Sequence, residues 1–277
     1  MIVKELKVNS ILTHSHISVI DLYFNPYIGC SHSCIYCCVE YMKSFSGHTE
    51  DSWGSFVDVK SNTLELLRKE INKGTNKNIL IGSLTDAYQP VEKKYRLTRQ
   101  SLKILSEKNI STYILTKSDL ITRDLDILSK MPSAKVGMSI AFADDVLRKS
   151  FEPFTSSTSK RLNTLKLLRE NGCETYAFIG PIIPGLTDLK KIFKELAKAG
   201  ISFAMGKMLD INRAFSHDLI RSLENIVNKQ ESRKIISLVH NAEYITETQM
   251  EFQKLCDYYE IENHGFFNPY SHALSNH

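Results

Sequence analysis

The chain of 277 residues lacks any long apolar run. No window approaches the roughly 18 uninterrupted apolar residues that a membrane-spanning helix needs. The opening stretch, MIVKELKVNS, has no apolar segment of signal-peptide length after its charges. We therefore expect a folded, cytoplasmic protein that makes no membrane contact and works in a reducing compartment.

An excess of charge of one sign is also missing. Lys and Arg total 35 against 31 Asp and Glu, which leaves a net charge of only +4. A nucleic-acid enzyme usually shows a denser basic stripe. Here the basic residues scatter over predicted helices, and we expect Arg96, Arg99 and Arg123 on helix surfaces. Composition therefore does not decide the class of substrate.

Cysteine is scarce except in one place. Four of the six cysteines lie within nine residues of the stretch NPYIGCSHSCIYCCVEYM (25–42), whereas Cys173 and Cys256 stand alone. Small secreted domains spread their cysteines along the chain as disulfide staples. In a reducing compartment, a cluster of this kind indicates metal ligands instead.

The spacing Cys30-x3-Cys34-x2-Cys37 supplies three thiolates from one loop. Structural zinc sites usually pair two short Cys/His hairpins, and no second Cys-x-x-Cys occurs in this chain. Three soft thiolates suit three corners of a cubane [4Fe–4S] cluster and leave one iron without a protein ligand. The pattern favours an iron–sulfur cluster, with zinc as the alternative.

Short β-rich runs alternate with helical patterns along most of the chain, which predicts parallel strands joined by crossover helices. Neither G-x-G-x-x-G nor a Walker sequence follows any of these strands, so nucleotide-binding doubly wound folds lose support. The predicted strands are 16–24, 78–83, 111–118, 134–142, 174–185 and 201–208, and the predicted helices are 61–74, 96–109, 122–131, 159–172 and 189–200. The cysteine loop follows the first strand, at the end where parallel α/β folds place their active sites.

Several stretches carry a resemblance to a known family. The cysteine motif, with Tyr36 before its last cysteine and a six-fold βα repeat behind it, resembles the radical SAM superfamily. Similarity to the spore-photoproduct-lyase-like branch, whose members are often labelled DNA repair photolyases, runs from about residue 20 to about 210. It lies in NPYIGCSHSCIYC, GSLTDAYQPVEKKYRLTRQ, ILTKSDLITRDLDIL, SFEPFTSSTSKRL and PIIPGLTD.

The resemblance implies an α/β fold, a partial (β/α)6 TIM barrel, formed as a single domain over 1–277. Its core would span about 16–210, and a C-terminal extension over about 211–277 would close the barrel. Within that extension, 243–261 reads as an amphipathic helix and 264–274 as an aromatic, turn-forming end.

The resemblance also implies chemistry. A [4Fe–4S] cluster on Cys30, Cys34 and Cys37 would bind S-adenosylmethionine (SAM), and a reductant such as flavodoxin or ferredoxin would trigger its cleavage to a 5′-deoxyadenosyl radical. The substrate would be a nucleic-acid base, a peptide or a small metabolite. A non-catalytic iron–sulfur or zinc protein is the alternative of a different class.

Candidate SAM contacts follow from the resemblance. Lys117 would pair with the methionine carboxylate, Ser139 would add a hydroxyl, and Tyr36 would cover the adenine. Each also has a structural alternative in turns or in the core. The remaining candidates are Ser83, Thr85 and Asp86 for the amino group, with Asp86 preferred, and Ile179 and Met208 for apolar contact.

Cys38 departs from the branch, which usually has Tyr after the last ligand. It is either a small buried side chain, a spare thiolate that competes for the cluster, or a hydrogen-atom donor to a substrate radical. Photoproduct lyases carry their donor cysteine between the cluster loop and the third strand. This chain has no cysteine between Cys38 and Cys173, which counts against true photoproduct lyase activity.

Overall fold

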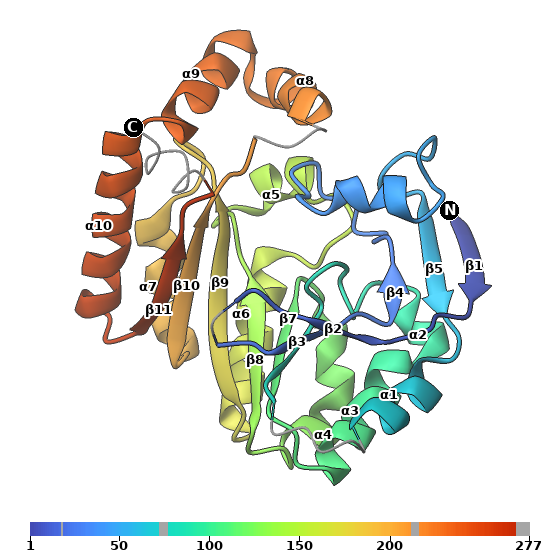
Figure 1. Ribbon diagram of the computed structural model, residues 1–277. Helices are drawn as coiled ribbons and strands as arrows, with labels where there is room; N and C mark the ends of the chain where they lie inside the picture. Colours follow the sequence, from blue (N-terminus) through green and yellow to red (C-terminus); the bar gives the residue numbers. More distant parts are fainter. Residues whose placement is uncertain (18, 72–76, 212–215, 270–277) are drawn as a thin grey trace.

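The computed structural model describes residues 1–17, 19–71, 77–211 and 216–269. Its centre is an eight-stranded sheet with the order β11-β10-β9-β8-β7-β6-β3-β2 (Figure 1). The strands are β2 (Leu12–His14), β3 (Leu22–Phe24), β6 (Ile79–Ile81), β7 (Thr112–Thr116), β8 (Ala134–Ser139), β9 (Glu174–Ile182), β10 (Phe203–Met208) and β11 (Glu262–Phe267). All neighbours are parallel except β2 and β3. The six predicted strands are therefore confirmed, although the first is shorter than expected.

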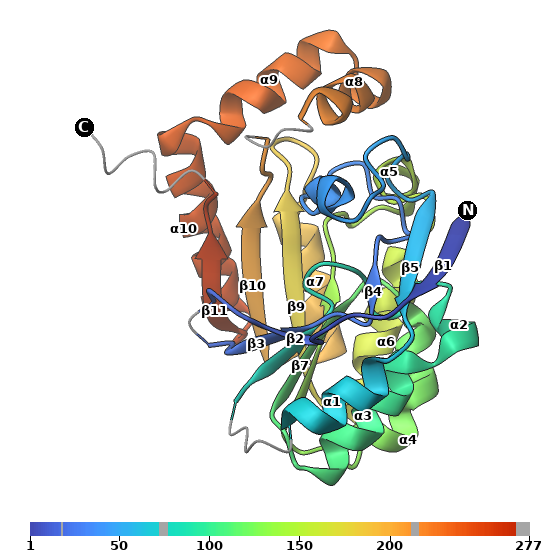
Figure 2. The same cartoon turned by 45° about the vertical axis from the view of Figure 1, so that its right-hand side comes forward.

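Helices cover the outer face of the sheet, and their periodic apolar residues supply its packing (Figures 1 and 2). The helices at the five predicted positions are α1 (Thr63–Ile71), α3 (Leu97–Glu107), α4 (Leu125–Leu128), α6 (Thr158–Glu170) and α7 (Leu189–Ala199). Two short helices, α2 (Glu92–Tyr95) and α5 (Asp145–Phe151), follow β6 and β8, and the 3-10 segments are η1 (Glu40–Phe45) and η2 (Asp119–Asp124). No helix among the described residues has the length and apolarity to cross a membrane.

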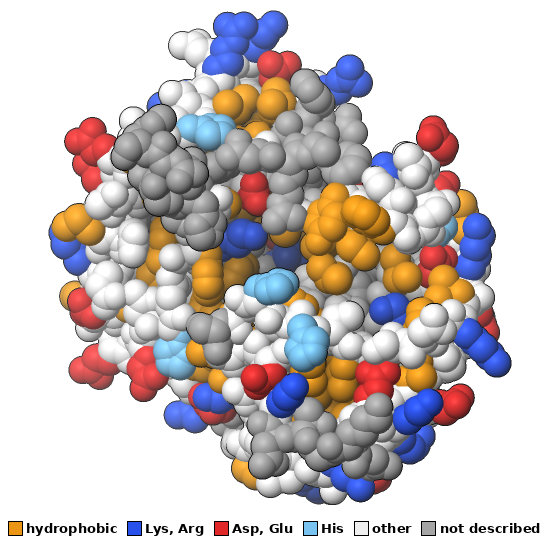
Figure 3. All heavy atoms as spheres, viewed as in Figure 1, with side chains coloured by type: hydrophobic (Ala, Val, Ile, Leu, Met, Phe, Trp, Pro, Cys, Tyr) orange, Lys and Arg blue, Asp and Glu red, His pale blue; other side chains and the backbone are white. Residues whose placement is uncertain are grey.

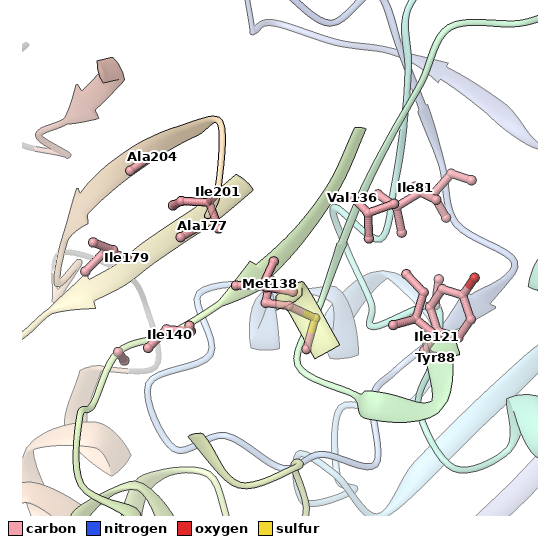
Figure 4. Close-up of a cluster of buried hydrophobic side chains, with 14 of the residues drawn as sticks. Ile81, Tyr88, Ile121, Val136, Met138, Ile140, Ala177, Ile179, Ile201 and Ala204 are labelled. Atoms are coloured by element: carbon pink, nitrogen blue, oxygen red, sulfur yellow. The ribbon is translucent and has the colours of Figure 1, made fainter. Parts of the chain in front are cut away.

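Alternation along each strand divides the side chains between two faces of the sheet. A Cβ on Gly206 of β10 would lie 2.9 Å from the ring of Phe252 in α10 (Ala242–Tyr258), so this side of β10 faces the helices. Gly206 pairs with Ile179 of β9. Ile179 therefore belongs to the helix-covered core, and Figure 4 shows it among the buried apolar side chains. Tyr176 lies on the opposite, inner face, where a Cβ on Gly137 would meet its ring at 2.2 Å.

The C-terminal extension lengthens the sheet instead of joining its two edges. Strand β11 pairs in parallel with β10, while β2 forms the other edge, so the sheet is not closed. The predicted helix over 243–261 is confirmed as α10, but residues 264–267 extend the strand β11 instead of forming a turn, and 270–277 lie outside the described residues. Helices α8 (Ser216–Val227) and α9 (Lys229–Val239) sit above the carboxyl ends of β9 and β10 (Figures 1 and 2).

A second sheet, which the sequence pattern does not predict, supports the cysteine loop. It has three strands in the order β1-β5-β4, formed by β1 (Ile2–Leu6), β5 (Phe56–Lys60) and β4 (Tyr27–Ile28). The loop leading into β5 packs on the cysteine loop, because a Cβ on Gly54 would lie 2.4 Å from the Ser33 side chain. Ser33 Oγ also donates a hydrogen bond to Trp53 O at 3.2 Å.

A buried ion-pair network holds the segment after β6 to the segment after β7. Arg123 Nη2 lies 2.8 Å from Glu92 Oε1, and Arg99 Nη1 lies 2.9 Å from Asp124 Oδ1. The side chains of Glu92 and Asp124 are fully buried, and those of Arg99 and Arg123 are about four-fifths buried. Arg99 and Arg123 lie on helical segments and are partly exposed, as expected, but their guanidinium groups also compensate buried carboxylates, which the sequence did not indicate. Arg96 is exposed, as expected.

Substitution of Arg123 tests this network. We expect Arg123→Met to lower the free energy of unfolding by about 3 kcal/mol, because it leaves Glu92 buried without its cation. The control is Lys166→Met, which breaks the exposed Lys166–Glu170 pair and should cost under about 0.5 kcal/mol. Urea denaturation measures both values, and equal losses would contradict a structural role for the network.

Candidate active site

The cysteine loop has turns but no helix or strand between Gly29 and Val39. Cys30 and Cys34 are buried, and Cys37 and Cys38 are partly buried. All six cysteines lie in the described part of the chain, and none forms a disulfide. The loop therefore presents four thiols in one place, at the carboxyl ends of β3 and β6.

Without a bound metal, the surroundings of these thiols disfavour the thiolate form. Burial raises the pKa of Cys34 and Cys37 well above the usual range, and neighbouring thiols raise both further. Lys117 acts in the opposite direction at Cys34. Thiols in such a setting become thiolate ligands when a metal supplies the positive charge.

Asp86 connects the cysteine loop to the end of β7. Its Oδ1 accepts hydrogen bonds from Thr116 Oγ1 at 2.6 Å and Tyr88 N at 2.9 Å. Its Oδ2 accepts from Lys117 N at 2.7 Å and lies 3.3 Å from Nδ1 of the buried His32. Burial alone would raise the pKa of Asp86, but His32, Thr116 and Lys117 hold it well below its usual value.

The same ion pair keeps His32 charged. Burial disfavours the imidazolium, yet Asp86 and Cys30 raise the pKa of His32 to about 10. Because three hydrogen bonds and the ion pair with His32 already engage both oxygens of the Asp86 carboxylate, the geometry gives little support to Asp86 as the acceptor for a SAM amino group. Its observed contacts position the loop.

Ser83 and Thr85 also contact the chain itself. Ser83 Oγ accepts a hydrogen bond from Asn25 Nδ2 at 3.1 Å, and Asn25 Oδ1 accepts one from Leu84 N at 2.9 Å. Thr85 is buried, and its Oγ1 donates to Gly29 O at 2.6 Å. Thr85 therefore binds the backbone next to Cys30, whereas Ser83 is partly exposed.

Tyr36 is fixed by a buried ion pair that the sequence analysis did not identify. Its hydroxyl bonds to Glu152, and Glu152 pairs with Arg161. Arg161 Nη1 donates in turn to Ser139 O at 2.8 Å, at the end of β8. Burial would raise the pKa of Glu152, but Arg161 and Lys117 hold it below its usual value. Glu152 and Arg161 lie in the stretch SFEPFTSSTSKRL, and that shared stretch was their only signal in the sequence.

Lys117 and Ser139 lie at the ends of neighbouring strands, as predicted. The Lys117 ammonium lies 5.8 Å from the centre of the Tyr36 ring, within the range of a cation–π contact. Burial would lower the pKa of Lys117, but Cys34 and Glu152 raise it, so the side chain stays cationic. Ser139 is buried and its Oγ donates to Gly180 O at 3.3 Å.

Ile179 and Met208 lie away from this group. Ile179 belongs to the helix-covered face, as its pairing with Gly206 shows. Met208 follows Lys207, whose ammonium approaches the cysteine loop, so alternation directs Met208 to the other face. Both side chains are fully buried in the core. Their positions do not support them as contacts of the adenine.

Lys207 of β10 is a further cation beside the cysteine loop, and no motif in the sequence indicated it. Its Nζ lies 3.9 Å from Cys38 Sγ across 169 positions of the chain. The inner face of β10 therefore approaches Cys38. Figure 3 shows a hollow in this side of the molecule, lined by hydrophobic side chains with a basic one among them.

The family model of the radical SAM superfamily matches residues 24–197. This range contains the cysteine loop and the parallel strands β6, β7, β8 and β9. The chain belongs to the radical SAM superfamily. An uncharacterized protein of Methanocaldococcus jannaschii is 40% identical over 223 residues, which are 78% of this chain and 83% of that protein. A Pseudomonas phage M6 protein named radical SAM Nalpha-GlyT isomerase is 22% identical and covers 90% of this chain, which spans 51% of that protein.

Solved structures of spore photoproduct lyase share the fold of this radical SAM protein. The lyase complexed with dinucleoside spore photoproduct superimposes with a TM-score of 0.74 at 14% identity, over 96% of this chain and 82% of that one. A mutant of that lyase with bound AdoMet and dinucleoside photoproduct gives a TM-score of 0.70. The resemblance to this superfamily and the partial-barrel fold are thus confirmed, and the protein is a SAM-dependent enzyme.

Radical SAM family members bind a [4Fe–4S] cluster and SAM, and the residues present fit both groups. Among the described residues, no three His, Cys, Asp or Glu side chains are arranged to hold one metal ion. The three thiols of Cys30, Cys34 and Cys37 on one loop are the soft donors that an iron–sulfur cluster takes. Lys117, beside Cys34, supplies a cation for a carboxylate.

Substitution of the adjacent residues Cys37 and Cys38 should have different effects on the iron content of the protein. We expect Cys37→Ala to lose most of its iron after anaerobic reconstitution, because it removes the third ligand of the motif. Cys38→Ala should keep its iron and lose only about 1 kcal/mol of stability. Iron analysis and denaturation measure these effects. Iron loss in Cys38→Ala with normal loading of Cys37→Ala would overturn the ligand assignment.

The Tyr36–Glu152–Arg161 network predicts unequal costs for its members. Glu152→Ala should lower the free energy of unfolding by about 3–5 kcal/mol, because it leaves Arg161 buried and unpaired. Tyr36→Phe keeps that ion pair and should cost about 1 kcal/mol. Guanidinium denaturation of the two variants compares the losses, and a Glu152→Ala protein as stable as Tyr36→Phe would refute the network.

Proposed function

We propose that this enzyme holds a [4Fe–4S] cluster on Cys30, Cys34 and Cys37 and uses it to cleave SAM reductively. The observation that carries the proposal is the gathering of these thiols on one buried loop, with the cationic Lys117 beside Cys34. When bound, the cluster and SAM supply one-electron cleavage of the sulfonium C–S bond, which gives methionine and a 5′-deoxyadenosyl radical that takes a hydrogen atom from the substrate. Flavodoxin or ferredoxin would supply the electron.

The chain's own residues have separate tasks in this proposal. Lys117 binds the methionine carboxylate as a compact positive charge, and Ser83 faces the amino group. Tyr36 covers the adenine, and its bond to Glu152 fixes the ring before SAM arrives. Ser139 and Thr85 act through the backbone carbonyls that they bind, Gly180 O in β9 and Gly29 O before Cys30. Pre-positioned groups of this kind lower the reorganisation needed during reaction.

For the substrate, we infer a nucleobase in DNA or RNA. The support is the lyase complexed with dinucleoside spore photoproduct, which matches 96% of this chain and 82% of its own. SuiB bound to its precursor peptide matches less well, with a TM-score of 0.50 over 46% of that chain. A peptide or small metabolite is therefore the alternative, and the mildly basic composition favours neither.

Cys38 is the proposed hydrogen-atom donor. The support for this role is that its sulfur lies on the cysteine loop and faces Lys207 on the inner face of β10. The thiol would give one hydrogen atom to the radical and become a thiyl radical. One electron from the same flavodoxin or ferredoxin and one proton from water would restore the thiol.

Reconstitution with iron and sulfide tests the cluster and the SAM reaction together. The protein should take up about four irons per chain, and after reduction with dithionite it should release 5′-deoxyadenosine slowly from SAM without substrate. Cys34→Ala should abolish this release. Tetrahedral binding of one zinc, with no uptake of iron, would instead establish a non-catalytic metal protein. Full SAM cleavage by Cys34→Ala would contradict the ligand set.

A further inference from the structure

The side chain of Gln89 spans the two peptide groups that flank Cys30. Its Oε1 accepts a hydrogen bond from Ser31 N at 2.9 Å, and its Nε2 donates to Gly29 O at 3.1 Å. Nε2 also donates to Thr85 Oγ1 at 2.9 Å. Gln89 is fully buried, although it lies 59 positions from Cys30 in the sequence.

These bonds meet a specific need of the loop. Around Cys30 the backbone belongs to neither helix nor strand, so its buried polar groups require side-chain partners. Gly29 adds a second restraint: its φ is +79°, and a Cβ there would lie 2.6 Å from Phe56 O. The peptide before Cys30 therefore packs against β5 at Phe56, and the peptide after Cys30 is hydrogen-bonded to Gln89 through Ser31 N.

A primary amide makes both bonds at once. A carboxylate at position 89 has no proton to give to Gly29 O, and an apolar side chain serves neither peptide. While Gln89 Oε1 accepts from Ser31 N, that amide is also unavailable to a thiolate sulfur. Hydrogen bonds to the sulfurs are among the factors that set the reduction potential of an iron–sulfur cluster.

We propose that Gln89 is a positioning residue for Cys30, which fixes the first thiolate ligand and thereby sets the retention and the potential of the cluster. The inference rests on the cluster function proposed above. It gives the stretch TDAYQPVE a physical role: Thr85 and Gln89 hold the cysteine loop on one side, and Asp86 holds it through His32.

The chain offers a matched control in Asn62. Its amide makes the same pair of bonds to one backbone site far from the cysteines: Oδ1 accepts from Val8 N at 3.0 Å, and Nδ2 donates to Val8 O at 2.8 Å. Because Gln89 is fully buried and Asn62 is partly exposed, the stability of each variant is measured and iron release is compared with it. An effect on the cluster should be confined to Gln89.

The experiment compares Gln89→Glu, Gln89→Leu, Asn62→Asp and Asn62→Leu after anaerobic reconstitution. We expect both Gln89 variants to release iron to a chelator roughly tenfold faster than wild type, since about one to two hydrogen bonds are lost, and to show an altered midpoint potential. The Asn62 variants should match wild type in both measurements. Thermal unfolding of each protein reports stability separately.

Several outcomes would overturn the inference. Wild-type iron release and potential in the Gln89 variants would do so, and so would an equal acceleration by the Asn62 variants. Should Gln89→Leu fail to fold, Gln89→Glu still tests the inference, because it preserves the shape of the side chain. Amide hydrogen exchange in the wild type adds a further test, because rapid exchange of the Ser31 amide would refute its bond to Gln89. A wild-type protein that takes up no iron would instead contradict the proposed function itself.

Discussion

Three thiols must be held in place by a loop that has almost no backbone hydrogen bonds of its own, and the rest of the site depends on meeting that requirement. Within the loop, Ser33 N and Cys37 N bond to the carbonyls of Cys30 and Cys34 at 3.3 and 3.2 Å. Most other restraints come from side chains that follow distant elements, Thr85, Asp86 and Gln89 after β6 and Glu152 at the end of α5. An irregular loop can stay buried only when such partners replace the missing ladder.

The partners are charged as well as polar, which explains the unusual density of buried ions at this end of the sheet. His32 binds Asp86, Tyr36 binds Glu152, and Glu152 binds Arg161. A buried ion pair contributes little net stability compared with apolar packing, but removal of one partner is costly. Such pairs therefore fix geometry more than they stabilise the fold. That property suits a site in which a cluster, a cofactor and a substrate must meet in one arrangement.

The sequence predicted the fold better than the site. Alternation of apolar runs located all six parallel strands, because a strand buried under helices needs a continuous apolar stretch. The cysteine spacing identified the loop because the whole motif lies in one short stretch of the sequence. The sequence analysis did not identify Glu152, Arg161 or Lys207, because each meets its partner only in the folded chain. Glu152 lies 116 positions from Tyr36, and Lys207 lies 169 positions from Cys38. Arg161 is 9 positions from Glu152. For Ile179 and Met208 the sequence left a cofactor contact and a core position both open, because only the observed register shows which face of a strand each residue occupies.

The open sheet bears on the size of the substrate. Because β11 extends the edge beyond β10, the extension leaves the edges β2 and β11 unjoined while α8 and α9 stand above the carboxyl ends of β9 and β10. On the inner face of this open sheet, Lys207 of β10 lies near Cys38. A base carried on a polymer must reach the cysteine loop while its backbone stays outside, and the unjoined edges of the sheet support the proposed nucleobase substrate on that ground. The contact between Lys207 and Cys38 likewise supports the proposal that Cys38 is the donor thiol.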